Sequence, residues 1–159
     1  ILGSLLIIAY ISFRFELKFA LGGVIALVHD IIIAIGVIAL LGYEINSSFI
    51  AAILTILGYS INDTIVVYDR IRENLKRHKG LSLENIIDNS VNDVMRRSLN
   101  TSFTTLLAVL AVLIFGGDTL KSFMVTLLVG IGIGTYSSIF VASPVVYLLE
   151  GKLKSKIKL

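Results

Sequence analysis

Side chains that can bind a proton or hold a charge stand inside apolar stretches of this sequence. Asp63 lies in the stretch GYSINDTIVVYDRIREN, at residues 58–74. Arg97 opens a later apolar run, and Asp30 stands beside His29 within an earlier one. A carboxyl group in a low-dielectric environment takes up a proton more readily than one in water, whereas an arginine stays charged. These residue types therefore indicate reversible proton binding.

Asp63 and Arg97 would form a two-state device if they meet. In one state they are an ion pair, and in the other a neutral acid stands beside an unpaired arginine. Because an unpaired buried charge is costly, proton uptake should move the arginine or admit water. A proton that enters on one side of a membrane and leaves on the other could then drive a conformational cycle. The proton is the coupling ion, and no other cofactor is expected.

Polar residues on the helical face of Asp63 extend this site. Thr55, Tyr59 and Asn62 precede Asp63 at spacings that place all four on one stripe of a helix. A polar stripe within an apolar segment is predicted to face the interior of a bundle or a water-filled cavity. The alternative is a strip of hydrogen bonds that only packs two helices together.

Arg97 shares a helical face with Thr101 and Thr104, which favours an inward orientation. The alternative is an arginine that extends to the membrane surface, as we expect for Arg96. Asp30 shares its face with small residues and is predicted to look toward a neighbouring helix, either as a proton-coupling group or as a structural hydrogen-bond acceptor.

Gly130 and Gly134 stand one helical turn apart in the last apolar segment. This small-xxx-small pattern predicts close helix packing. It is not a dinucleotide-binding loop, because no strand and turn precede a helix here.

Composition sets the class of protein. Hydrophobic residues make up 56% of the chain, charged residues 16%, and the mean hydropathy is +0.92, whereas soluble domains carry about 25% charged residues. The chain has no cysteine and two histidines far apart, so we expect no disulfide and no metal site. No nucleophile–base pair or phosphate loop is present, so we do not expect an enzyme.

The apolar segments predict an all-α membrane protein, a polytopic transmembrane helix bundle that forms one domain over residues 1–159. The predicted spans are about 1–13 (the partial end of a cut helix), 19–41, 47–69, 99–115 and 120–149. Between the third and fourth spans, residues 70–97 form an amphipathic connection. Its helix is predicted to begin after Ser82 as N-cap, to lie along the membrane surface and to feed into the fourth span.

All of the 14 lysines and arginines except Lys121 fall on one side of this topology. The positive-inside rule places that side, with the 70–97 connection and the C-terminus, in the cytoplasm. The net charge of +3 is explained by topology and by attraction to anionic membrane lipid. It requires no nucleic acid.

The stretch at 58–74 resembles the SecF signature of the SecD/SecF family of protein-export membrane proteins. Three further stretches are similar to that family: residues 28–30, 97–102, and the run from 115 through the glycine-rich segment 130–144. Ile61-Asn-Asp63 is closer to the SecF version of the motif than to the SecD version. The resemblance covers nearly the whole chain in the right order.

The resemblance implies a fold of the resistance-nodulation-division superfamily, with six transmembrane helices of which this chain holds helices two to six. The first helix and a large extracytoplasmic domain would be missing. It implies SecD, the SecYEG translocon and the translocating preprotein as partners, in the cytoplasmic (inner) membrane, with export assisted by the proton gradient. Proton coupling in the family maps onto Asp63 and Arg97, and with weaker support onto Asp30.

Two other functions stay open at this point. One is a proton-coupled transporter of small molecules or lipids from the same superfamily, which the 58–74 signature disfavours. The other is a passive scaffold of the translocon, for which Asp63 would be dispensable.

Overall fold

The computed structural model describes residues 17–78 and 80–149. This part of the chain is helical apart from short connections and contains no β-strand. Its elements are α2 (Leu17–Leu40), α3 (Ser47–Arg77), α4 (Leu83–Phe115), α5 (Asp118–Ser137) and a π-helical turn (Ser138–Ala142), after which 143–149 are again α-helical. Four helices, the last running through Leu149, are long and apolar enough to cross a membrane. The predicted all-α membrane bundle is confirmed. The predicted partial span at 1–13 lies outside the described residues.

Local chemistry fixes the ends of the helices. The side chain of Asn46 caps α3 by accepting a hydrogen bond from the backbone N–H of Phe49, at 3.1 Å. The hydroxyl oxygen of Ser82 caps α4 by accepting a hydrogen bond from the backbone N–H of Asn85, at 3.3 Å, as the sequence predicts. Gly117, between α4 and α5, has a φ of 79°, a left-handed conformation that glycine adopts without a steric penalty. The connections are therefore short and set by a few residues.

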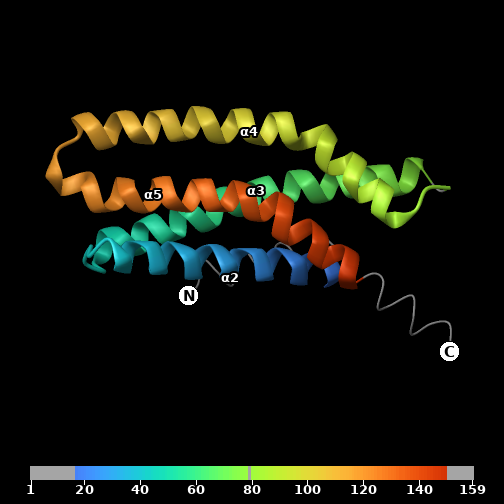
Figure 1. Ribbon diagram of the computed structural model, residues 1–159, viewed down its shortest axis with the longest axis horizontal. Helices are drawn as coiled ribbons and strands as arrows, with labels where there is room; N and C mark the ends of the chain where they lie inside the picture. Colours follow the sequence, from blue (N-terminus) through green and yellow to red (C-terminus); the bar gives the residue numbers. More distant parts are fainter. Residues whose placement is uncertain (1–16, 79, 150–159) are drawn as a thin grey trace.

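Helix α5 is the central element of the bundle. Figure 1 shows α5 between α4 and α2, with α3 crossing behind, and α5 packs against all three. Buried apolar side chains form two clusters along these contacts. The larger cluster includes Leu27, Ile61, Val67, Tyr68 and Val146, and the smaller includes Ile56, Val109, Leu127 and Ile131.

The connection at 70–97 consists of extensions of the two flanking spans, and its apolar face packs differently from the prediction. Helix α3 continues to Arg77, and α4 begins at Leu83 and runs without a break to Phe115, so the connection and the fourth span form one helix. Figure 1 shows the first part of α4 lying obliquely beside the end of α3. Within the described part of the chain, no separate helix forms between α3 and α4.

The apolar face of early α4 packs on α3, which is the physical reason for this difference. Ile86 and Val94 are buried there. The side-chain amide of Asn74 donates to the hydroxyl of Ser90 at 3.0 Å, and Arg70 forms an ion pair with Asp93 at 2.7 Å. The face that the sequence predicts to lie on lipid finds a protein partner instead, because α3 is long enough to reach it.

Pro144 accounts for the irregular turn in the last span. Proline lacks an N–H, and its ring collides with the carbonyl four residues earlier in a regular helix. The π turn at Ser138–Ala142 ends two residues before Pro144 and changes the spacing of the backbone hydrogen bonds there. Tyr68 of α3 donates its hydroxyl to the carbonyl oxygen of Ala142 at 3.3 Å. The turn is thus held from the side by the neighbouring helix.

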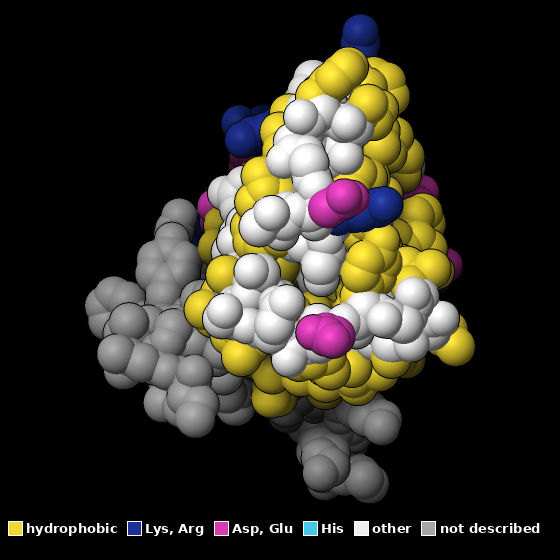
Figure 2. Space-filling model, turned by 90° about the vertical axis from the view of Figure 1, so that its left-hand side faces the viewer, with side chains coloured by type: hydrophobic (Ala, Val, Ile, Leu, Met, Phe, Trp, Pro, Cys, Tyr) yellow, Lys and Arg dark blue, Asp and Glu magenta, His cyan; other side chains and the backbone are white. Residues whose placement is uncertain are grey.

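The surface agrees with a membrane-spanning bundle. Figure 2 faces the end that carries the α2–α3 and α4–α5 connections, where polar and acidic side chains gather while hydrophobic side chains cover the flanks. Large apolar side chains are exposed along the helices, among them Ile32 and Phe103, each 63% exposed. In a chain with these helices, such flanks suit lipid or other membrane helices.

Gly130 is predicted to be required for the approach of α5 to α3. A Cβ atom at this position would lie 2.1 to 2.9 Å from three side-chain atoms of Ile56, whereas one at Gly132 would meet nothing within 4 Å. Gly130→Ala should lower the free energy of unfolding by about 1–3 kcal/mol through overpacking. Gly132→Ala, the matched control, should not. Denaturant unfolding of the full-length protein in detergent measures both, and equal stability of the two variants would contradict the packing.

Candidate functional site

Asp63 stands where α3 and α4 meet. The hydroxyl of Ser98, on α4, donates a hydrogen bond to its Oδ1 at 2.6 Å. Its Oδ2 is buried and has no hydrogen-bond partner among the described residues. Asp63 itself is half-buried, at the side of the helix that faces the bundle. One carboxyl oxygen is therefore fixed by a hydroxyl, and the other is enclosed without a donor.

Arg97 does not lie as the sequence predicts. It stands on the exposed side of α4, and no ion pair joins it to Asp63 in the described part of the chain. It is still near enough for its charge to act on the Asp63 carboxylate. The predicted inward face runs through Arg97 and Thr101. The buried face in this part of α4 includes Ser98 and Ser102, so it is displaced by one residue from the predicted face. The residue that contacts Asp63 is thus the serine directly after the arginine.

The predicted polar stripe is divided by the structure. Tyr59 faces α4, and its hydroxyl donates to the hydroxyl of Ser102 at 3.2 Å. Thr55 and Asn62 are exposed, and Thr55 donates to the backbone carbonyl of Ala51 in its own helix. Thr101 is also exposed, and its hydroxyl likewise donates within α4. Only Tyr59 and Asp63 of the stripe reach the neighbouring helix.

Asp30 is completely buried between α2 and α3. The hydroxyl of Ser60 donates to its Oδ2 at 2.6 Å, and Nδ1 of His29 lies 3.1 Å from its Oδ1. The small residues Gly23, Ala26 and Ala34 are buried on the same face, as their spacing indicates. Asp30 and Asp63 therefore have the same kind of partner, a serine on the next helix.

The hydroxyl groups of Thr64 and Ser138 meet near the backbone carbonyl of Ser60, between α3 and the π turn. Thr64 and Ser138 lie within hydrogen-bond distance, Oγ1 to Oγ at 2.9 Å, and the Ser138 hydroxyl also reaches the backbone carbonyl of Ser60 at 3.3 Å. The structure places Gly134 against Ser60, where an added Cβ would lie 3.0 Å from the serine Cβ. The glycine lets the two helices approach closely enough for these bonds to form.

Ser98, Ser60, Thr64 and Ser138 are functional candidates that sequence reasoning does not single out. Serine and threonine are common in membrane helices, and their role depends on which carboxyl group or carbonyl lies opposite. Each of the four is buried. Burial of a hydroxyl between helices is the signal that identifies them, and this signal requires the packed structure.

Hydroxyl groups are the hydrogen-bonding partners that the neighbouring helices bring to both carboxyl groups. A hydroxyl can donate to an ionised carboxylate and accept from a protonated one, so it supports both states of the acid. Within the residues that the structure describes, no three potential metal-ligating side chains come together.

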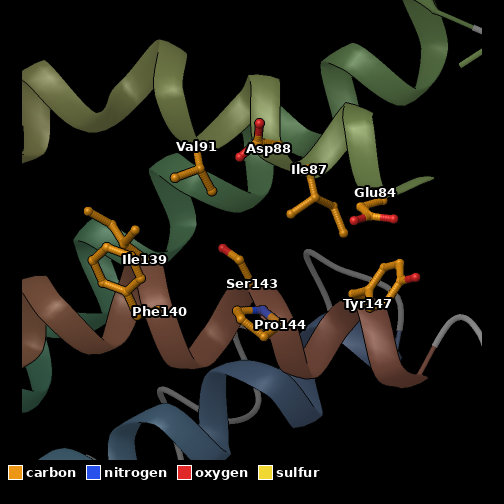
Figure 3. A pocket seen from close by; sticks show the side chains of 9 residues that line it. All are labelled: Glu84, Ile87, Asp88, Val91, Ile139, Phe140, Ser143, Pro144 and Tyr147. Atoms are coloured by element: carbon orange, nitrogen blue, oxygen red, sulfur yellow. The ribbon is translucent and has the colours of Figure 1, made fainter. Parts of the chain in front are cut away.

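A groove lies apart from these residues, between the start of α4 and the end of the last span. Its volume is about 310 Å³, and its lining includes Glu84, Asp88, Phe140 and Tyr147. Figure 3 shows Glu84 and Asp88 on α4 opposite the aromatic rings of the last span. The groove is lined in part by residues of the π turn, among them Phe140.

The chain is similar to known protein-export membrane proteins. A family model described as protein export membrane protein SecD/SecF, C-terminal, matches residues 1–152. The SecF translocase subunit of Sebaldella termitidis is 59% identical over 150 residues, covering 94% of this chain and 49% of that protein. The corresponding subunit of Petrotoga mobilis is 49% identical over 146 residues, covering 92% and 48%. This chain spans about half the length of the curated relatives it matches.

Two solved structures resemble this one. A crystal structure of SecDF in a super-membrane-facing form has a TM-score of 0.91 and 44% sequence identity, covering 96% of this chain and 21% of that chain. SecDF of Thermus thermophilus, titled a translocon-associated membrane protein, has a TM-score of 0.87 and 45% identity, covering 91% and 20%. The helix arrangement described above is thus that of part of the SecDF membrane region.

Ser98 is predicted to stabilise the bundle through Asp63. Ser98→Ala removes the hydroxyl that bonds Oδ1 and leaves the carboxylate without a donor, which should cost about 1–3 kcal/mol of unfolding free energy. Thr101→Ala removes an exposed hydroxyl from the same helix and should change stability by less than about 0.5 kcal/mol. Unfolding of both variants in detergent measures the difference. A Ser98→Ala protein as stable as Thr101→Ala would contradict this role.

Proposed function

This chain belongs to the SecD/SecF family of protein-export membrane proteins, and on that premise we propose that it forms the membrane part of a SecF-type subunit that uses the proton gradient to assist Sec-dependent export. The proposed partners are SecD, the SecYEG translocon and the translocating preprotein. The proposed location is the cytoplasmic (inner) membrane, in which the subunit crosses the bilayer several times.

One observation carries the proposal: Asp63 is bonded by a single serine hydroxyl while its second carboxyl oxygen is buried without a donor. A buried ionised oxygen that lacks a hydrogen bond is unfavourable, and binding a proton removes that cost. Asp63 also lies in the middle of a helix that is long enough to cross a membrane. A carboxyl group inside such a helix, with one oxygen bonded and the other left to gain from a proton, is suited to reversible proton binding.

Arg97 is proposed to respond to the charge on Asp63. In this structure its charge acts on the carboxylate without direct contact. An ionised Asp63 attracts the guanidinium, and a protonated one releases it. A change in the position of Arg97 on α4 would then accompany each proton, which agrees with the two-state device that the sequence suggests, although the two residues are not paired here.

The distribution of charge supports the proposed orientation. Basic residues such as Arg72, Lys76 and Arg96 gather at the end formed by late α3 and early α4. Lys121, at the opposite end, lies 4.0 Å from Asp118. The positive-inside rule assigns the end with more basic residues to the cytoplasm. With that orientation the C-terminal side of the last span also faces the cytoplasm, where anionic lipid would attract its basic residues.

Export measured with and without a proton gradient tests this proposal. Translocation of a preprotein into membrane vesicles should lose its stimulation by the gradient in Asp63→Asn, because an amide cannot exchange the proton, while the protein still assembles with its partners. Arg97→Met should lose the stimulation too. Asp88→Asn and Arg96→Met are matched controls that change an exposed group of the same type and should keep it.

Stimulated export at the normal level in both Asp63→Asn and Arg97→Met would refute the proposal and favour a passive scaffold. A small-molecule or lipid transporter predicts instead that export is unchanged while gradient-driven uptake of a solute or lipid is lost in Asp63→Asn. Measuring both processes in the same vesicles separates the three functions.

A further inference from the structure

Asp30 contacts a serine hydroxyl and an imidazole ring. It is 0% exposed. His29 on its own helix is 30% exposed and is its titratable neighbour, and Tyr68 lies two turns further along α3 than Ser60. In the described part of the chain no lysine or arginine contacts Asp30, and the groups that α3 and α5 bring to this region are the hydroxyls of Ser60, Thr64 and Ser138.

Ser60 joins α2, α3 and α5 at a single point. Its hydroxyl donates to Asp30 on α2 at 2.6 Å. Its backbone carbonyl lies 3.1 Å from the Thr64 hydroxyl of its own helix and 3.3 Å from the Ser138 hydroxyl of the last span. The single hydrogen of the Ser138 hydroxyl can also be donated to the Gly134 carbonyl, at 2.8 Å, so these contacts are alternatives. Its side chain packs against Gly134 of α5. A change in the bonding of Ser60 therefore reaches two other helices directly.

The π turn begins at the residue that Ser60 contacts. Ser138 is the first residue of the turn and Ala142 the last. Helix α3 holds the first end through Thr64 and Ser60, and the other end through the Tyr68 hydroxyl, which donates to the Ala142 carbonyl. A π turn has wider hydrogen bonding than an α-helix and frequently marks functional positions. Groups of α3 therefore contact both ends of the turn.

We propose that Ser60 is a positioning residue that transmits the protonation of Asp30 to the π turn of the last span. The inference rests on the proposed function, in which carboxyl groups inside the bundle exchange protons. When a proton adds to a carboxylate oxygen of Asp30, Ser60 loses an ionised acceptor, and hydrogen bonds to charged groups are roughly twice as strong as those between neutral groups. The contact of Ser60 with Gly134 and Ser138 then relaxes, and the π turn shifts.

Cysteine labelling can follow the π turn, because the chain has no native cysteine. Phe140 lies within the turn, is 56% exposed and lines the groove that carries Glu84 and Asp88; Figure 3 shows its ring beside Ile139. In the full-length protein bearing Phe140→Cys, the rate of reaction with a water-soluble maleimide, corrected for thiol ionisation with a free thiol, should change between mildly acidic and mildly basic pH. Asp30→Asn should abolish that change.

Variants of the connecting residues test the role of Ser60. Ser60→Ala should abolish the pH-dependent change, and combining it with Asp30→Asn should have no further effect. If Ser60→Ala does not fold, Ser138→Ala removes the next bond in the chain and should have the same result. Ser137→Ala is the matched control, because the buried Ser137 hydroxyl donates to the Gly134 carbonyl within α5 and has no other bond among the described residues. It should keep the wild-type change.

The inference is overturned if the labelling rate of wild type is independent of pH, or if Ser60→Ala and Ser138→Ala retain the change that Asp30→Asn removes. Its failure is distinguishable from failure of the proposed function, because export is assayed separately. Loss of gradient-stimulated export in Asp63→Asn, together with retained pH-dependent labelling in Ser60→Ala, would reject the role of Ser60 alone.

Discussion

A serine on an adjacent helix holds each of the two buried carboxyl groups of this bundle. Ser98 bonds Asp63 between α4 and α3, and Ser60 bonds Asp30 between α3 and α2, both at 2.6 Å. A carboxylate in such surroundings would be costly without a donor, and a cation in direct contact would favour the ionised form alone. A hydroxyl tolerates both forms. The rest of the structure depends on bringing these hydroxyls within reach of the acids.

Close helix packing provides that reach. Gly130 and Gly134 allow α5 to approach α3 at Ile56 and Ser60, and Gly22 of α2 lies against the hydroxyl of Tyr68. Because lipid tails are themselves apolar, the hydrophobic effect does not drive helices together within a membrane. Such contacts rely instead on small residues and on interhelical hydrogen bonds. The same glycines that pack the bundle therefore position its polar network. This is why packing and the proposed chemistry cannot be separated in α5.

The sequence predicts the fold well, because long apolar segments in a membrane allow few structures other than helices. It also predicts Asp63 and Asp30 as carboxyl groups inside those segments. It does not predict that the apolar face of the 70–97 connection packs on α3, since that face could equally meet lipid. Nor does it predict Ser98, because helical spacing from Arg97 through Thr101 selects a face displaced by one residue from the buried one. Such a displacement depends on the rotation of α4 about its axis, which only packing determines.

The central claim is that Asp63 changes protonation state when the protein works, and infrared difference spectroscopy tests it most directly. The full-length protein, reconstituted with its partners, would be compared with and without a proton gradient. The account predicts a protonated-carboxyl signal that changes with the gradient in wild type and is absent in Asp63→Asn. A carboxyl signal that does not respond to the gradient, or one that responds equally in Asp63→Asn, would contradict it.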